Sequence, residues 1–414
     1  MTDRFDILIS GASYSGAALA LALEKSLGGP PQPALKIGVL DKSNPTAASQ
    51  QPESPRAFAI AAASRNLLEY IGVWPQIADK SQPVAQIEIT DSPLDAGIRP
   101  VLMTYENTVD GCEPGSHIVP DAVLANALHA ALDNSSITVL RGVEALEMRD
   151  INSAAAVKCS DGIERTADLV VAAEGRISRL RDQAGIKSLG WDYNQSGICT
   201  VIAHSKPHDG RAAQHFLPGG PFAILPLPGN KSCITWSEKS GEARRIMALD
   251  EAGFLAEVEK RVAGRLGELS IVTKPAYWPL NLRISRSLVA GRLALIGDTA
   301  RGVHPIAGQG LNLGMRDVAA LTEIIVDNAR IGLPPSDPDG LQRYERWRRF
   351  DSTMSAAAFH GLNKLFSNDN TLLRSVREAG LGLVDRLPFA KSLFVNEAAG
   401  LSGEVPRLLR GEAL

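Results

Sequence analysis

Cysteine is scarce in the chain, and its four residues, Cys112, Cys159, Cys199 and Cys233, stand far apart without forming a CxxC pair. This spacing favours reduced, buried thiols over a disulfide framework or a zinc site. The sequence also lacks the run of about 18 or more apolar residues that a membrane-spanning helix requires. Its opening, MTDRFDILISG, lacks the basic and then apolar order of a signal peptide. We therefore expect a soluble, cytoplasmic protein that at most attaches to a membrane surface.

An excess of one charge sign is also missing, because 43 Lys and Arg residues nearly balance 46 Asp and Glu residues and leave a net charge of −3. Without a basic field, the composition gives no support for binding to nucleic acid. The most basic cluster is most simply a solvated helix face. It consists of Arg343, Arg346, Arg348 and Arg349.

The pattern of apolar runs predicts an α/β fold. Residues 5–10 (FDILIS) are typical of a buried strand, and residues 11–16 of a glycine turn. A helix at 17–25 and a second strand at 35–41 follow, so that the four segments together form a βαβ unit. Further helices are expected at 120–132 and 310–327, and further strands at 137–140, 154–159, 168–173 and 292–296. Short apolar runs separated by Gly and Pro predict an antiparallel sheet between residues 196 and 238.

These elements divide the chain into three parts, in keeping with the two to three domains that its length predicts. We expect a Rossmann-like nucleotide-binding domain built from discontinuous segments, residues 1–82, 101–182 and 275–343. A mainly antiparallel substrate-binding sheet, residues 83–100 and 183–274, interrupts it. Residues 344–414 are expected to form a C-terminal helical region.

Three segments carry residues suited to one cofactor site. The first is the strand–turn–helix containing Gly11, Ser13, Ser15 and Gly16. Gly11 permits a tight turn, Gly16 permits close helix–strand packing, and the first N–H groups of the helix would face a pyrophosphate. Ser13 replaces the usual middle glycine, and its hydroxyl is suited to contact a phosphate. Asp41 ends the second strand, where it would accept hydrogen bonds from a ribose. A structural turn is the alternative.

The second and third segments each place a glycine turn between a strand and a helix. Glu174-Gly175 follows one apolar strand, and an ordinary strand–turn–helix is its alternative. Gly297-Asp298 follows another, in LIGDTARGVHPIAGQGLNLGMRD (295–317), and brings a carboxylate to a sheet edge. The glycine-rich turn that follows lets backbone approach a planar ring, and the N-terminus of the next helix stabilises negative charge there. A plain helix cap is the alternative for Asp298.

Two further patterns bear on the site. Residues 216–228 (FLPGGPFAILPLP) predict either the apolar wall of a substrate pocket or the core of a sheet. His204 and His208 are four residues apart, but Pro207 breaks any shared helix face, so we expect no metal site.

With these motifs in place, the chain resembles the class A flavoprotein monooxygenases, and within them the ubiquinone-biosynthesis hydroxylases. The stretches HPIAGQGLNLGMRD (304–317) and LGLVDRLPFAKSLF (381–394) carry the resemblance most specifically, and PRAFAIAAASR (55–65) also matches. It departs from the family at Ser13 and at Glu174, where an aspartate is usual. The resemblance implies catalytic positions at His304, Pro305, Gly308 and Gln309, with a structural hydrogen bond as the alternative for His304. It implies FAD binding by Gly11, Ser13, Ser15, Gly16, Asp41, Arg56, Glu174, Gly175, Gly297, Asp298, Gly310, Leu311 and Asn312.

The resemblance also implies a reaction. NADPH or NADH reduces FAD, and oxygen then hydroxylates the aromatic ring of a polyprenylated phenol in ubiquinone biosynthesis through a flavin hydroperoxide. The alternatives are a flavin-dependent dehydrogenase or reductase on the same scaffold, and a non-catalytic flavin-binding member of a biosynthetic complex. A polyprenyl tail requires an apolar entrance, and apolar clusters in the C-terminal segments could form it at a membrane surface. Core packing or docking of a partner protein is the alternative explanation of these clusters. The segments suited to peripheral contact at the inner membrane face contain Leu362, Leu365, Phe366, Leu381, Leu383, Val384 and Leu387.

Overall fold

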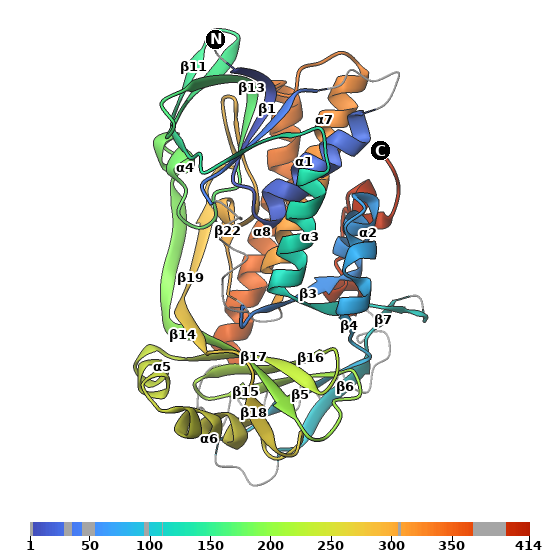
Figure 1. The fold of residues 1–414 in the computed structure, drawn as a ribbon, viewed down its shortest axis with the longest axis vertical. Coiled ribbons are helices and arrows are strands. Elements are labelled where there is room, and N and C mark those ends of the chain that lie inside the picture. The colour runs from blue at the N-terminus through green and yellow to red at the C-terminus, as the bar shows by residue number, and fades with distance from the viewer. Residues whose placement is uncertain are drawn as a thin grey trace.

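Two large sheets organise the chain, one above the other in Figure 1. The upper sheet is mostly parallel and is flanked by long helices, whereas the lower sheet is mostly antiparallel. The structure is a computed structural model that describes residues 3–28, 35–43, 54–94, 99–109, 111–304, 308–366 and 395–414, with only some side chains described within 350–366.

The upper, eight-stranded sheet begins with the predicted βαβ unit. Strands β1 and β2 pair in parallel, and helix α1 connects them. The side chains of Ile7, Leu8 and Ile9 on β1 are fully buried, as expected of a strand covered on both faces. The strands are β1 (Asp3–Ser10), β2 (Ile37–Asp41), β10 (Thr138–Arg141), β11 (Ala145–Ile151), β12 (Ala154–Cys159), β13 (Glu164–Ala172), β20 (Val289–Ala290) and β21 (Leu293–Leu295). The helices around it include α1 (Tyr14–Leu27), α3 (Asp121–Asp133), α4 (Arg179–Gln183), α7 (Gly310–Arg330) and α8 (Pro338–Phe366). No helix in the described ranges is both long and apolar enough to cross a membrane.

The lower, nine-stranded sheet contains the predicted antiparallel region, with one parallel pair between β5 and β15. Its strands are β5 (Gln86–Asp91), β6 (Val101–Glu106), β14 (Ser188–His204), β15 (Arg211–Leu217), β16 (Gly220–Leu227), β17 (Lys231–Lys239), β18 (Leu269–Ile271), β19 (Ala276–Ser285) and β22 (Arg301–Gly302). The predicted domain limits place β6, β19 and β22 with the nucleotide-binding domain, whereas in the structure all three strands belong to this sheet. Strand β6 pairs with its neighbour β5, β19 pairs along β14, and β22 pairs with β19.

The smaller elements join the two sheets. Strand β3 (Ala57–Ala61) pairs with β9 (Ser116–Pro120), which also pairs with β4 (Gln82–Pro83), and β7 (Thr108–Val109) pairs with β8 (Glu113–Pro114). Helix α2 (Ala62–Tyr70) follows β3 directly.

A ribbon formed by β14 and β19 runs from the upper sheet into the lower one (Figure 1). The pairing extends from Ser188↔Ser285 to Cys199↔Ala276, with a register shift between Asp192 and Gln195. Strand β17 joins the other edge of β14 from Gln195 onward. The same strand therefore belongs first to the narrow ribbon and then to the interior of the lower sheet.

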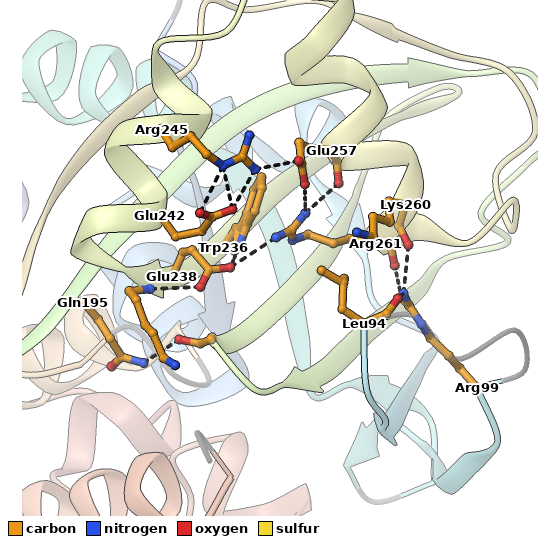
Figure 2. A network of polar contacts seen from close by, with 12 residues as sticks. Leu94, Arg99, Gln195, Trp236, Glu238, Glu242, Arg245, Glu257, Lys260 and Arg261 are labelled. Carbon is orange, nitrogen blue, oxygen red and sulfur yellow. Dashed lines mark hydrogen bonds and ion pairs between the residues drawn. The ribbon is translucent and has the colours of Figure 1, made fainter. Parts of the chain in front are cut away.

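Helices α5 (Ser240–Met247) and α6 (Glu251–Val262) cover one face of the lower sheet, and buried Arg261 holds α6 against it. Figure 2 shows Arg261 pairing with Glu238 of β17 at 3.2 Å and with Glu257 at 2.6 Å. Its guanidinium lies 3.8 Å from the centre of the Trp236 ring, a favourable cation–π geometry. Arg99 donates to carbonyl groups in the last turn of α6, where a cation is stabilised by the helix dipole.

A buried charge cluster holds the upper half together beneath the turn that contains Gly297. Asp317 of α7 accepts hydrogen bonds from Arg301 at 2.6 Å, from Arg348 at 2.8 Å and from the Gly297 N–H at 3.0 Å. All three charged side chains are at most 1% exposed. The expectation that Arg348 lies on a solvated helix face is therefore wrong, because the α7–α8 contact places it in the interior.

We predict that Asp317→Asn lowers the free energy of unfolding by about 3–5 kcal/mol, because it leaves buried Arg301 without its carboxylate partner and deprives buried Arg348 of one carboxylate, although Asp351 still pairs with it. Asp327→Asn is the matched control on the same helix, since Asp327 pairs with Arg407 in a partly exposed bridge that is worth about 1 kcal/mol or less. Chemical denaturation of both variants measures the difference. Equal losses would contradict the role given to Asp317.

We also predict that stability falls as the pH drops below about 6.5. His215 is 1% exposed, and burial lowers its pKa to about 3, with further lowering by Arg265 and Arg99. The unfolded state binds a proton at this residue before the folded state does, so stability is present above the unfolded pKa and is lost towards the folded one. Between pH 7.5 and 5.0 the loss from His215 is about 2 kcal/mol. His215→Asn should reduce the difference in the free energy of unfolding between these two pH values by that amount, as measured by chemical denaturation. An unchanged difference would show that His215 does not cause the pH dependence.

Candidate active site

The predicted site residues converge on one cavity of about 2110 Å³ between the two sheets. Pro305 lies outside the described residues, and Gly16 is the one described member of the predicted set that does not line the cavity. Those that line it are Gly11, Ser13, Ser15, Asp41, Arg56, Glu174, Gly175, Gly297, Asp298, His304, Gly308, Gln309, Gly310, Leu311 and Asn312.

The first turn shows why its glycines are needed. Gly11 has a φ of +108°, and a Cβ there would lie 2.3 Å from the Ala173 carbonyl oxygen; a Cβ at Gly16 would lie 1.8 Å from the Gly11 oxygen. Helix α1 starts at Tyr14, earlier than predicted, with Ser13 as an extended N-cap whose side chain makes no capping bond. The first turn holds no acidic residue. The positive end of the helix is therefore left for an anion.

Asp41 presents an unsatisfied carboxylate oxygen at the end of β2. Its Oδ1 accepts hydrogen bonds from the Ser43 N–H at 3.0 Å and the Ser43 hydroxyl at 2.7 Å. Its Oδ2 is buried and has no hydrogen-bond partner among the described residues, with Arg141 Nη1 3.9 Å away. A buried carboxylate oxygen is costly to leave unpaired, and a ribose hydroxyl is a suitable donor for it.

Glu174 is engaged by the protein itself. Its Oε1 accepts from the Ser10 hydroxyl at 2.7 Å, and its Oε2 accepts from the Ser178 hydroxyl at 2.6 Å and the Leu180 N–H at 3.2 Å. The carboxylate thus braces the end of β1 against the start of α4. Contact between Glu174 and a cofactor stays a prediction.

The third turn packs closely on the first. Gly297 has a φ of +60°, and a Cβ at Gly297 or Gly314 would lie within 2.7 Å of the Ser15 hydroxyl. Asp298 is partly exposed at the cavity and pairs with Arg176 at 3.4 Å. Sequence reasoning did not select Arg176, because three arginines occur between residues 176 and 181 and the sequence gives no sign of which one reaches Asp298.

At the start of α7, side chains tie down the turn and leave the backbone open. Asn312 accepts from the Ala61 N–H at 3.1 Å and donates to the Ala59 oxygen at 2.9 Å, while Gln309 donates to the Ala398 oxygen at 3.3 Å. The helix has neither a capping side chain nor an acidic residue in its first turn. A second positive helix end therefore faces the cavity.

The surroundings shift the pKa of three titratable side chains near the turns. Burial lowers the pKa of His304 to about 4, with a smaller contribution from Arg176, so this side chain is neutral near pH 7. Burial raises the pKa of Tyr14, as does Asp121, which accepts a hydrogen bond from the Tyr14 hydroxyl. Burial also lowers the pKa of Arg316.

The lower sheet supplies the opposite wall of the cavity, and strand alternation decides which residues belong to it. On β16, Ala223 and Leu225 line the cavity, whereas Phe222 and Ile224 pack into the core beneath α5 and α6. One face of this strand therefore packs in the sheet core, and the other lines the cavity; that the cavity wall contacts a substrate stays a prediction. The wall is mainly apolar, and Trp278 lies beside Arg56, whose guanidinium is 5.8 Å from the ring centre.

These features suit FAD and an apolar substrate together. Two uncapped helix ends match a pyrophosphate and a ring that takes up negative charge on reduction, and the Asp41 oxygen matches a ribose. The volume is about twice the upper end of the usual range for small-molecule pockets, roughly 1,000 Å³. A dinucleotide fills only part of such a space, which leaves the apolar sheet face for a second molecule.

Comparison with known proteins agrees with this geometry. Residues 4–349 match the FAD binding domain family. The chain is 37% identical over 413 residues to the ubiquinone hydroxylase UbiL of Rhodospirillum rubrum, covering 99% of this chain and 93% of the relative. It is 31% identical over 407 residues to the 3-demethoxyubiquinol 3-hydroxylase of Escherichia coli, covering 96% and 98%.

The fold is also that of solved monooxygenase structures. The p-nitrophenol 4-monooxygenase PnpA of Pseudomonas putida superposes with a TM-score of 0.79 at 16% identity, covering 98% of this chain and all of that one. The chain therefore belongs to the FAD binding domain family and, within it, to the class A FAD-dependent aromatic monooxygenases that include the ubiquinone-biosynthesis hydroxylases.

Proposed function

We propose that this enzyme hydroxylates the aromatic ring of a polyprenylated phenol in ubiquinone biosynthesis, with FAD as cofactor, NADPH or NADH as reductant and molecular oxygen as co-substrate. The observation that carries the proposal is the shared cavity, in which the cofactor turns face an apolar sheet. Relatives named as ubiquinone hydroxylases over nearly the full chain support the same substrate class.

The residues divide the work between holding the cofactor and shaping its surroundings. The start of α1 would hold the pyrophosphate and Asp41 the adenosine ribose, while Asp298 would accept from the ribityl chain. The backbone at Gly310 and Leu311 would stabilise negative charge at the ring, as a preorganised helix end can. Bound FAD supplies the activation of oxygen. Neutral His304 and the apolar sheet face would keep the space beside the ring dry.

We further propose peripheral contact with the inner face of a membrane, and membership of a biosynthetic complex, because a polyprenyl tail partitions into lipid. On α8, Met354 and Leu365 are 57% and 38% exposed, which supports an apolar approach along this helix. The side chains of Leu362 and Phe366, and the whole of 381–387, lie outside the described residues.

Removal of the Asp41 carboxylate is expected to weaken FAD binding. Asp41→Ala should raise the dissociation constant about 10- to 100-fold, the typical effect of losing a hydrogen bond to a charged group. Asp133→Ala is the matched control, because Asp133 also pairs with Arg141 but is 60% exposed and does not line the cavity. Titration of the apoprotein with FAD, followed by flavin fluorescence, measures both. Equal affinities in the two variants would remove Asp41 from the site.

The reaction itself is tested with purified protein, FAD, NADPH or NADH and a set of polyprenylphenols under isotope-labelled oxygen. We expect mass spectrometry to find one labelled oxygen atom in the product. Reductant oxidation without incorporation of oxygen would indicate a reductase instead. A colourless protein that takes up no flavin would indicate a non-catalytic member.

A further inference from the structure

The cavity face of the lower sheet carries one amide in an otherwise largely apolar row. Strand pairing places Gln214 of β15 directly beside Ile89 of β5 on one side and Ala223 of β16 on the other. Continuing across the sheet, Ala223 is paired with Thr235 of β17, and Thr235 with Cys199 of β14. All five of these residues line the cavity, so the row runs across its floor.

The polar groups next to Gln214 do not compete for a ligand in the cavity. The Thr235 hydroxyl and the Cys199 thiol lie 3.5 Å apart in a mutual hydrogen bond. His215, the next residue after Gln214, points to the opposite face, where its Nδ1 bonds the Thr90 hydroxyl at 2.7 Å and its ring stacks on Phe222. Its Nε2 has no hydrogen-bond partner among the described residues, but on that face it is turned away from the cavity.

Gln214 differs from them. Its Nε2 is buried and has no hydrogen-bond partner in the part of the chain that the structure describes. A buried amide donor without an acceptor costs free energy, and rotation about the last side-chain bond can present either end of the amide to the cavity. The surrounding Ile89 and Ala223 side chains have no acceptor to offer. An acceptor must arrive with the occupant of the cavity.

We propose that Gln214 is a specificity-determining residue that donates a hydrogen bond to an oxygen on the aromatic ring of the substrate. The inference rests on the proposed function, because it takes the occupant of the sheet face to be an oxygenated phenol ring with an apolar tail. Phenolic hydroxyl and methoxy oxygens both accept such a bond. Rings that lack the oxygen would leave the donor unpaired, so the residue sets a preference as well as an orientation.

The test uses the oxidised, FAD-loaded protein and three geranylated benzenes: one without ring oxygen, one with a hydroxyl, and one with a hydroxyl and a methoxy group. Perturbation of the flavin absorbance gives a dissociation constant for each. We expect the wild type to prefer an oxygen-bearing ring, and Gln214→Met to reduce that preference about 3- to 10-fold, the usual effect of one hydrogen bond. In turnover, Gln214→Met should raise the KM for the oxygen-bearing rings by the same factor, with kcat less affected.

The matched control is Ile89→Val, which alters the shape of the floor beside Gln214 without touching a polar group. Any change in packing shifts all three dissociation constants together, so the ratios between them should stay as in the wild type. Gln214→Asn keeps the amide with a shorter reach and should give a partial loss of preference. It replaces Gln214→Met in this test if Gln214→Met does not bind FAD. Unchanged ratios in Gln214→Met, or in Gln214→Asn where that variant replaces it, would overturn the role of Gln214 while leaving the proposed function standing. If no ring perturbs the wild-type flavin, the proposed function falls and the role of Gln214 falls with it.

Discussion

The contact on which the rest of the site depends is the buried carboxylate of Asp317. One oxygen accepts from two arginines on different elements, and the other accepts from the backbone of Gly297 at the cofactor turn. A buried carboxylate of this kind is stable when all of its partners are present. Asp317 thus connects the turn, both long helices and the end of the lower sheet, although it does not itself line the cavity.

Local sequence was enough to predict the turns that line the cavity. Gly11 and Gly297 stand where strands end and helices begin, and the sequence around each predicts the turn that requires the glycine. Long-range partners could not be predicted in this way. Nothing near Glu174 in the sequence indicates Ser10, and nothing near Gln214 indicates that Ile89 lies beside it. The same limit applies to β19, whose sheet membership depends on its pairing with β14.

The lower sheet serves two environments at once. One face packs on α5 and α6 through Trp236 and Arg261, while the other forms the floor of the cavity. Because successive residues of a strand point to opposite faces, a shift of one residue in pairing would exchange the core for the floor. The contacts of Arg261 help to fix the pairing register of the sheet. They therefore help to determine which side chains face the cavity, although Arg261 lies on the opposite face of the sheet.

The ribbon of β14 and β19 has a mechanical consequence. Two hydrogen-bonded strands resist stretching and sliding, but they bend where the register breaks, here between Asp192 and Gln195. Asn194 at this break has a φ of +54°, so the backbone there already departs from the extended form. The change in direction of β14 between the two sheets is therefore concentrated at this irregularity, and the geometry of these few residues fixes the angle at which the floor of the cavity faces the turns above it.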